Sequence, residues 1–236
     1  MNLLIVSTST IYGKPYLSYL KEECADFFSN APKILFIPFA RPGGMTHEAY
    51  TAKAKEVFSS WGFEMRGAHE FTDAQEGCRW ADGFFTGGGN TFVLAKTLHE
   101  SGYFEAIDSA VRAGKPYMGT SAGCNLTGMS ICTTNDMPIV YPPSFDAWGW
   151  VPFNINPHYL DPVEGSTHMG ETRATRIKEF HEFNNQPVYG LREGSWIRVH
   201  GTSMELKGLH SARLFRRGEH PTESKKILFE HFVYNN

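Results

Sequence analysis

Uninterrupted apolar runs alternate with amphipathic stretches along the first half of the chain. The runs at Leu3–Ser7, Lys33–Phe39 and Gly83–Thr86 lack polar alternation, which is typical of strands buried on both faces of a parallel sheet. Strand and helix patterns in alternation predict an α/β fold with a doubly wound, mostly parallel sheet. The other elements expected here are helices at Tyr16–Phe28, from a Thr46 cap to about Trp61, Thr91–Leu98 and Tyr103–Ala113, and strands at Glu64–Arg66 and Pro116–Gly119.

The pattern changes after Asn125. Residues Met137–Pro157 are rich in Pro, Trp and Phe with weak periodicity, which predicts loop and short strand, and Glu171–Phe183 is the last predicted helix. Short runs between glycine turns then predict a C-terminal antiparallel flank, and no repeat or linker divides residues 1–236, so we expect a single domain. The expected strands of the flank are Val188–Leu191, Trp196–Val199, Ser203–Leu206, Ala212–Phe215 and Lys226–Phe229.

Composition narrows the class of protein. The chain has 236 residues, 41% of them hydrophobic and 20% charged, which is ordinary for a globular protein, and its net charge of −3 does not suggest a nucleic-acid partner. No apolar stretch approaches the roughly 18–20 residues needed to span a bilayer, and the N-terminus has the pattern of a strand rather than a signal peptide. The four cysteines lack C-x-x-C pairing, so neither a disulfide framework nor a zinc site is expected. We therefore expect a cytoplasmic protein without a membrane partner, either a monomer or a homodimer.

Gly119–Gly123, with the sequence Gly-Thr-Ser-Ala-Gly, has the G-x-S-x-G form of a nucleophile elbow. It follows a predicted strand and precedes a helix expected over Ala122–Thr127, which is the context that this motif requires. Ser121 is therefore the candidate nucleophile, although a glycine-rich turn with a capping serine would have the same sequence. Cys124 is a second nucleophilic side chain nearby, but its place one helical turn further on favours a structural role.

A serine nucleophile needs a base, and the base needs a third group to orient it. His158, in Asn-Pro-His, and Glu193, in Arg-Glu-Gly, can fill these two roles. Among the ten histidines, His168 is the main competitor for the role of base, and the sequence around Glu193 does not distinguish it from an exposed loop glutamate. The order Ser, His, Glu differs from that of α/β-hydrolases, so we expect a serine hydrolase on another α/β scaffold.

A second glycine-rich turn, Gly87–Asn90, lies between a predicted strand and a predicted helix. Glycines let the backbone approach a ligand closely, and a helix N-terminus offers unpaired N–H groups. A phosphate cradle is one interpretation, but the P-loop lysine and the G-x-G-x-x-G spacing are both absent. We interpret the turn as half of an oxyanion hole, in which the N–H of Gly88 or Gly89 acts together with the N–H of Ala122. A tight turn without a ligand remains the alternative.

Taken together, these motifs resemble the peptidase E family of serine peptidases. The resemblance implies a flavodoxin-like sheet related to class I glutamine amidotransferases. It also implies a Ser-His-Glu triad at Ser121, His158 and Glu193, and cleavage of dipeptides with an N-terminal aspartate, without a metal or other cofactor. The matching segments cover nearly the whole chain: Ile37-Pro-Phe-Ala, Gly87-Gly-Gly-Asn, Gly119-Thr-Ser-Ala-Gly, Thr134-Asn-Asp-Met-Pro-Ile, Ser144-Phe-Asp-Ala, Asn156-Pro-His, Gly170-Glu-Thr-Arg-x-x-Arg-Ile and Glu193-Gly-x-Trp.

Such a substrate carries two charges that need partners on the protein. Arg173, in Gly-Glu-Thr-Arg, could hold the aspartate side chain through bidentate contacts, although an arginine on a helix is often a surface residue. Arg176, Arg192 or backbone donors are the alternatives, and Asp136 or Asn90 could accept the α-ammonium group. Two other functions stay open: a cyanophycinase-like hydrolase of β-Asp-Arg units, and a noncatalytic small-molecule binder on the same fold.

Overall fold

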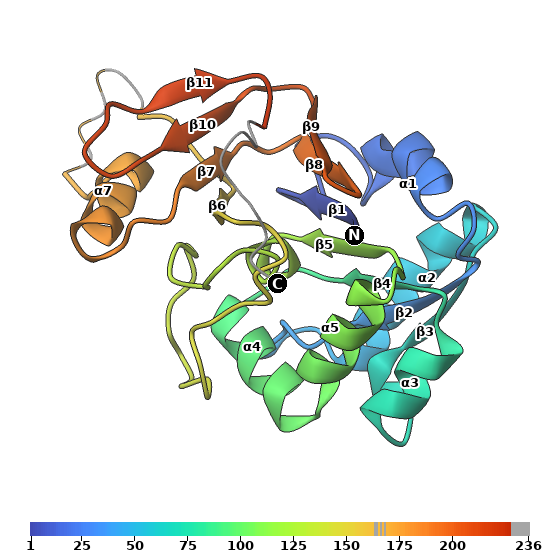
Figure 1. The fold of residues 1–236 in the computed structure, drawn as a ribbon. Coiled ribbons are helices and arrows are strands. Elements are labelled where there is room, and N and C mark those ends of the chain that lie inside the picture. The colour runs from blue at the N-terminus through green and yellow to red at the C-terminus, as the bar shows by residue number, and fades with distance from the viewer. Residues whose placement is uncertain (163–164, 166, 168, 228–236) are drawn as a thin grey trace.

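Two β-sheets form the framework of the computed structural model, which describes residues 1–162, 165, 167 and 169–227 (Figure 1). The larger sheet has seven strands in the order β3-β2-β4-β5-β1-β8-β9, and the smaller has four in the order β11-β10-β7-β6. The strands are β1 (Asn2–Val6), β2 (Lys33–Ile37), β3 (Glu64–Gly67), β4 (Gly83–Thr86), β5 (Tyr117–Thr120), β6 (Asn154–Pro157), β7 (Val188–Leu191), β8 (Ser195–His200), β9 (Ser203–Gly208), β10 (Ala212–Phe215) and β11 (Thr222–Ser224).

The larger sheet confirms the expected α/β fold. Strands β3, β2, β4, β5 and β1 run parallel, and β8 and β9 continue the sheet in antiparallel orientation. Successive side chains of a strand point to opposite faces, so Leu3 and Ile5 pack in one hydrophobic cluster and Leu4 and Val6 in another. Both faces are covered, which explains why β1 has no polar alternation.

Helices cover the two faces of this sheet separately. Helices α1 (Lys21–Phe27) and α2 (His47–Ser60) pack on the face of Leu4 and Val6, whereas α3 (Ala74–Trp80), α4 (Thr91–Glu100) and α5 (Tyr103–Arg112) pack on the other (Figure 1). The short helix α6 (Ala122–Asn125) follows β5, and α7 (Arg173–Phe183) lies beside the smaller sheet. Within the described ranges, no helix combines the length and apolar character needed to cross a membrane.

Several helices differ from the sequence prediction. The helix expected from Tyr16 begins with a 3-10 turn at Ser18–Leu20, because Leu17 has a left-handed φ of 58° that interrupts it. Helix α3 was not predicted, although Asp73 accepts a hydrogen bond from the Glu76 N–H at 2.7 Å as an N-cap. The helix expected over residues 122–127 ends at residue 125.

The Pro-, Trp- and Phe-rich segment is loop and short strand, as predicted, but part of it is buried. The rings of Trp148 and Trp150 stack with centroids 4.3 Å apart. Both indole N–H groups donate to α5, Trp148 to the Phe104 carbonyl oxygen at 3.0 Å and Trp150 to Asp108 Oδ1 at 2.6 Å. These two hydrogen bonds anchor the segment before β6 to α5.

The C-terminal flank has a different strand pairing from the one expected. Strand β7 lies antiparallel to β10 but parallel to β6, and β8 joins β1 in the larger sheet instead of β7. Of the strand expected at Lys226–Phe229, the first two residues are not in a strand and the last two lie outside the described residues. Alternating polarity predicts a strand but not its partner, because tertiary packing selects the partner.

Candidate active site

Ser121 lies on a sharp turn between β5 and α6. Its backbone angles are φ 53° and ψ −109°, a conformation that is costly for a residue with a side chain. The turn is held on both sides, because the Ser121 N–H donates to the Val6 carbonyl oxygen at 3.1 Å and the Asn125 N–H donates to the Ser121 carbonyl oxygen at 3.0 Å. The strand, strained serine and helix that characterise a nucleophile elbow are therefore all present.

Close backbone contacts explain the glycines around Ser121. A Cβ atom on Gly119 would lie 2.3 Å from the Gly123 carbonyl oxygen, and one on Gly123 would lie 2.6 Å from the Thr86 carbonyl oxygen. In the neighbouring turn, a Cβ atom on Gly88 would lie 2.9 Å from the Ser121 Cβ. The turns that follow β4 and β5 are thus pressed together, with Gly88 directly beside the serine.

His158 reaches Ser121 from the smaller sheet. Its Nε2 lies 2.9 Å from Ser121 Oγ, and its Nδ1 lies 2.6 Å from Glu193 Oε1. His158 directly follows β6 and Glu193 comes two residues after β7, and these strands are parallel with Pro157 opposite Leu191. Parallel strands end at the same edge of a sheet, so the loops that leave them bring the two side chains together. His168, the competing candidate, lies outside the described residues.

Ser7, the residue after β1, connects the two sheets. Its hydroxyl donates to the Leu191 carbonyl oxygen at 2.7 Å and accepts a hydrogen bond from the His158 N–H at 2.9 Å. Ser7 is fully buried, and His158 has a φ of 53°, so this bond holds a backbone conformation that costs free energy. Sequence reasoning missed Ser7, because a serine at the end of a buried strand carries no motif of its own.

The candidate oxyanion donors are not equally free. The Gly88 N–H donates to the Tyr50 hydroxyl at 3.0 Å, a contact between distant segments that the sequence did not indicate. Within the described part of the chain, the N–H groups of Gly89 and Ala122 have no acceptor. Gly89 has a φ of 149°, and a Cβ atom there would lie 2.1 Å from the Ala40 carbonyl oxygen, so only glycine fits. Gly89 and Ala122 are therefore the available donors next to Ser121.

The nearest thiol is not placed for catalysis. Cys124 is fully buried among the apolar side chains that face α3, α4 and α5, and this burial raises the pKa of its thiol. A neutral thiol directed into the core is a weak nucleophile. Among the described residues, no group of three or more His, Cys, Asp or Glu side chains could hold a metal ion.

Asn90 and Asp136 meet at the N-terminus of α4. Asn90 Oδ1 caps the helix by accepting from the Val93 N–H at 3.1 Å, while its Nδ2 donates to the Met137 carbonyl oxygen at 2.8 Å. Asp136 Oδ2 accepts from the N–H and the hydroxyl of Thr91 at 2.8 and 2.6 Å. In the described structure Asp136 Oδ1 accepts no hydrogen bond. The Asn90 amide is thus engaged in capping, whereas Asp136 retains one free oxygen.

Arg173 is the first residue of α7, after the Thr172 cap. Burial lowers the pKa of its guanidinium and the nearby Arg176 lowers it further, whereas Asp136 opposes the shift. No carboxylate of the described residues forms a salt bridge with Arg173, whereas Arg176 lies 3.9 Å from Glu171. A cation in a first turn also faces the positive end of the helix dipole. This position is therefore unfavourable for Arg173 alone and suited to binding an anion.

Asn135 connects this region to His158, the candidate base. Its Nδ2 donates to the carbonyl oxygen of Pro157, the residue before His158, at 2.7 Å. Its Oδ1 accepts from the Asn156 amide at 2.8 Å. The loop that carries Asp136 therefore lies between the glycine turn before α4 and β6, the strand that ends directly before His158.

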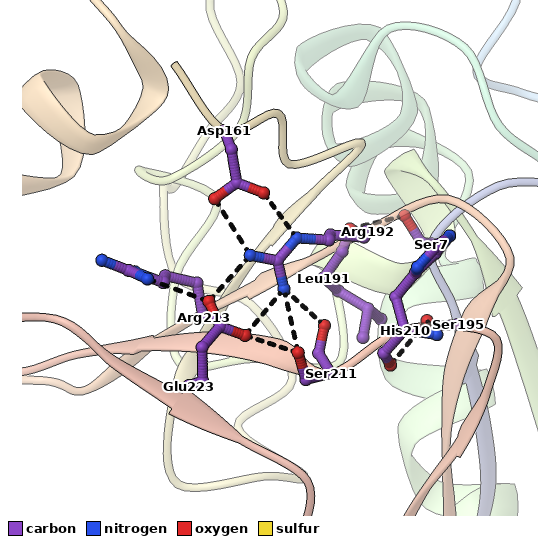
Figure 2. Close-up of polar contacts among 9 residues, drawn as sticks. All are labelled: Ser7, Asp161, Leu191, Arg192, Ser195, His210, Ser211, Arg213 and Glu223. Atoms are coloured by element: carbon purple, nitrogen blue, oxygen red, sulfur yellow. Dashed lines mark hydrogen bonds and ion pairs between the residues drawn. The ribbon is translucent and has the colours of Figure 1, made fainter. Parts of the chain in front are cut away.

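Arg192, one of the alternative partners for an aspartate side chain, is already paired. Its guanidinium donates to both carboxylate oxygens of Asp161 and to both of Glu223 (Figure 2). All of these contacts are between 2.8 and 3.0 Å. Its binding capacity is used within the protein, which leaves Arg173 as the freer cation.

The chain is similar to proteins of one peptidase family. The model of peptidase family S51 matches residues 3–207. Over 223 residues the chain is 49% identical to peptidase E of Streptomyces coelicolor, covering 94% of this chain and 90% of that protein. Over 218 residues it is 45% identical to a Drosophila melanogaster protein named "Probable alpha-aspartyl dipeptidase", covering 91% and 90%. The crystal structure of a peptidase from an acI-B1 Actinobacterium shares the fold, with a TM-score of 0.73 at 17% identity and coverage of 97% and 96%.

The junction at Ser7 gives a stability prediction. Ser7→Ala should lower the free energy of unfolding by about 1–3 kcal/mol, because the His158 N–H loses its acceptor and the Leu191 carbonyl loses one of its two donors. Urea denaturation measures the change. Ser18→Ala is the matched control, because the Ser18 hydroxyl donates to the Pro15 carbonyl oxygen at 2.9 Å at an exposed position and should change stability by less than about 0.5 kcal/mol. Equal effects of the two variants would contradict the role given to Ser7.

Proposed function

The chain belongs to peptidase family S51 and is a serine-type dipeptidase, and from this premise we propose that Ser121, His158 and Glu193 hydrolyse dipeptides with a free N-terminal aspartate. One observation carries the proposal: an unbroken line of contacts runs from Ser121 Oγ through the His158 ring to Glu193, at 2.9 and 2.6 Å. The name alpha-aspartyl dipeptidase, borne by the 45% identical relative, supports the choice of substrate.

The three side chains act in sequence on the peptide bond. His158 Nε2 takes the proton from Ser121 Oγ as that oxygen attacks the carbonyl carbon of the aspartyl residue. Glu193 accepts the hydrogen bond from Nδ1–H, which keeps Nε2 unprotonated beforehand and stabilises the imidazolium afterwards. The imidazolium then gives its proton to the departing amine and leaves an aspartyl ester on Ser121. A water molecule deprotonated by His158 hydrolyses the ester and frees aspartate.

Backbone N–H groups would stabilise the negative oxygen that forms in both steps. Gly89 and Ala122 supply donors that are free in the described structure. The Gly88 N–H could join them only by sharing or leaving the Tyr50 hydroxyl. Because these donors belong to tight glycine turns, they are fixed before the substrate arrives.

Selection of aspartate would depend on Arg173 and Asp136. The Arg173 guanidinium forms no salt bridge among the described residues and sits at the N-terminus of α7, where an incoming carboxylate would also meet the helix dipole. Asp136 Oδ1 is the acceptor that we assign to the α-ammonium group, and Asn90 would support this loop rather than bind substrate. The substrates would be small dipeptides, handled in the cytoplasm without a metal or other cofactor.

Removing the nucleophile tests the proposed function. Ser121→Ala should lower kcat for Asp-Leu by about 10⁴–10⁶-fold with an unchanged circular dichroism spectrum, because loss of a triad member removes the covalent route. Cys124→Ala is the control and should retain most of the activity. Near-normal hydrolysis by folded Ser121→Ala, or its loss in Cys124→Ala alone, would overturn the serine mechanism.

Substrate choice is tested at Arg173. Arg173→Met should raise the activation free energy derived from kcat/KM for Asp-Leu by about 2–5 kcal/mol, because the substrate carboxylate would be left unpaired. The same change should affect Asn-Leu far less. Arg173→Lys should restore part of the loss, because an ammonium cannot reproduce the planar fork. The matched control is Arg176→Met, one helical turn further on, which should change neither substrate. If Arg173→Met slowed both dipeptides equally, another group would have to recognise the aspartate.

A further inference from the structure

The guanidinium of Arg192 uses all five of its N–H donors. Nε and one Nη2 proton bond the two oxygens of Asp161 at 2.8 and 2.9 Å. The other Nη2 proton and one Nη1 proton bond the two oxygens of Glu223 at 2.8 and 3.0 Å, and Nη1 also donates to the Ser211 carbonyl oxygen at 2.7 Å (Figure 2). The side chain is only 16% exposed. Such saturation fixes the guanidinium in one place.

The partners of Arg192 lie on several segments that would otherwise be independent. Arg192 itself is between the end of β7 and Glu193, and Asp161 is three residues beyond His158. Ser211 directly precedes β10, and Glu223 is in β11. The network therefore ties the loop that carries the base and the loop that carries the acid to the body of the smaller sheet.

Few other contacts hold these two loops together. Beyond the last strand pair, the described residues supply three links: the Tyr159 N–H donates to the Leu191 carbonyl oxygen at 3.2 Å, the Ser7 hydroxyl joins that carbonyl to the His158 N–H, and His158 contacts Glu193. The first two links hold backbone atoms, and only the third acts on the side chains of the base and the acid. The side chains of that pair are 34% and 46% exposed. A side-chain contact exposed to this degree contributes about 1 kcal/mol or less, which is too little to fix a loop. The position of the pair must therefore come from the surrounding structure.

The network is balanced in charge. Arg192 and Arg213 face Asp161 and Glu223, and Arg213 Nη1 lies 2.9 Å from Glu223 Oε1. Hydrogen bonds from Arg192 lower the pKa of Glu223 to about 2, so the carboxylate stays ionised at neutral pH. A network without net charge exerts little field on the imidazole, so any effect on catalysis comes through position.

We propose that Arg192 is a positioning residue, which aligns His158 and Glu193 by clamping the loop after β6 to the loop after β7. The inference rests on the proposed function, because it assigns Arg192 to the same triad. Displacement of a catalytic group by about 1 Å can cost on the order of a hundredfold in rate.

The test is the rate at which a fluorophosphonate labels Ser121, located by peptide mass spectrometry, because this reagent needs an activated serine but no dipeptide specificity. Arg192→Met should slow labelling by about ten- to a hundredfold, and Arg192→Lys should recover part of the rate. Asp161→Asn alters a half-exposed partner without threatening the fold and should slow labelling by about three- to tenfold.

Arg217→Met is the matched control, because Arg217 also anchors the chain through Asn185 Oδ1 and the Glu182 carbonyl oxygen, away from the triad.

A double variant separates positioning from general damage. In the His158→Ala background, Arg192→Met should cause no further loss, because the imidazole through which it acts is gone. Wild-type labelling rates in both Arg192→Met and Asp161→Asn would overturn the inference, as would an undiminished effect of Arg192→Met in the double variant. Absence of labelling at Ser121 in the wild-type chain would instead overturn the proposed function, and this inference with it.

Discussion

The buried hydroxyl of Ser7 is the point at which the two sheets and the candidate triad meet. Its O–H donates to the Leu191 carbonyl oxygen, at the end of β7, and its oxygen accepts from the N–H of His158, directly after β6. The proposed nucleophile belongs to the larger sheet, whereas the proposed base and acid follow strands of the smaller one. Their alignment is therefore a property of the junction between sheets, and a small shift there would separate Ser121 from His158.

Much of the fold could be predicted from the sequence, because strands buried on both faces consist of uninterrupted apolar residues. The uninterrupted apolar runs of β1, β2 and β4 identified the parallel strands, since both faces of the sheet are covered. Helix α3 also has a sequence signal, because Asp73 and Glu76 have the spacing of an N-cap and its third helical residue. The parallel pairing of β6 with β7 could not be predicted, because the residues of a short strand do not indicate which other strand it pairs with.

In the candidate site too, local motifs could be predicted from the sequence, whereas contacts between distant segments could not. The Gly119–Gly123 motif predicted the elbow, since each glycine is forced by a backbone contact that leaves no room for a Cβ atom. The family resemblance implies roles for His158 and Glu193, and the structure brings the two side chains into contact through β6 and β7. Ser7 and Tyr50 carry no motif, because their contacts join segments that only the tertiary fold brings together.

The covalent state of Ser121 during turnover is the most direct measurement of the proposed chemistry. An aspartyl ester with a good leaving group, such as p-nitrophenol, should acylate the chain faster than water deacylates it. After acid quenching and digestion, we predict one aspartyl group, removable by hydroxylamine, on the peptide that contains Ser121. A burst of p-nitrophenol equal in amount to the protein should accompany it. Turnover without an acylated peptide, or an aspartyl group found on a cysteine, would contradict the assignment of Ser121 as the nucleophile.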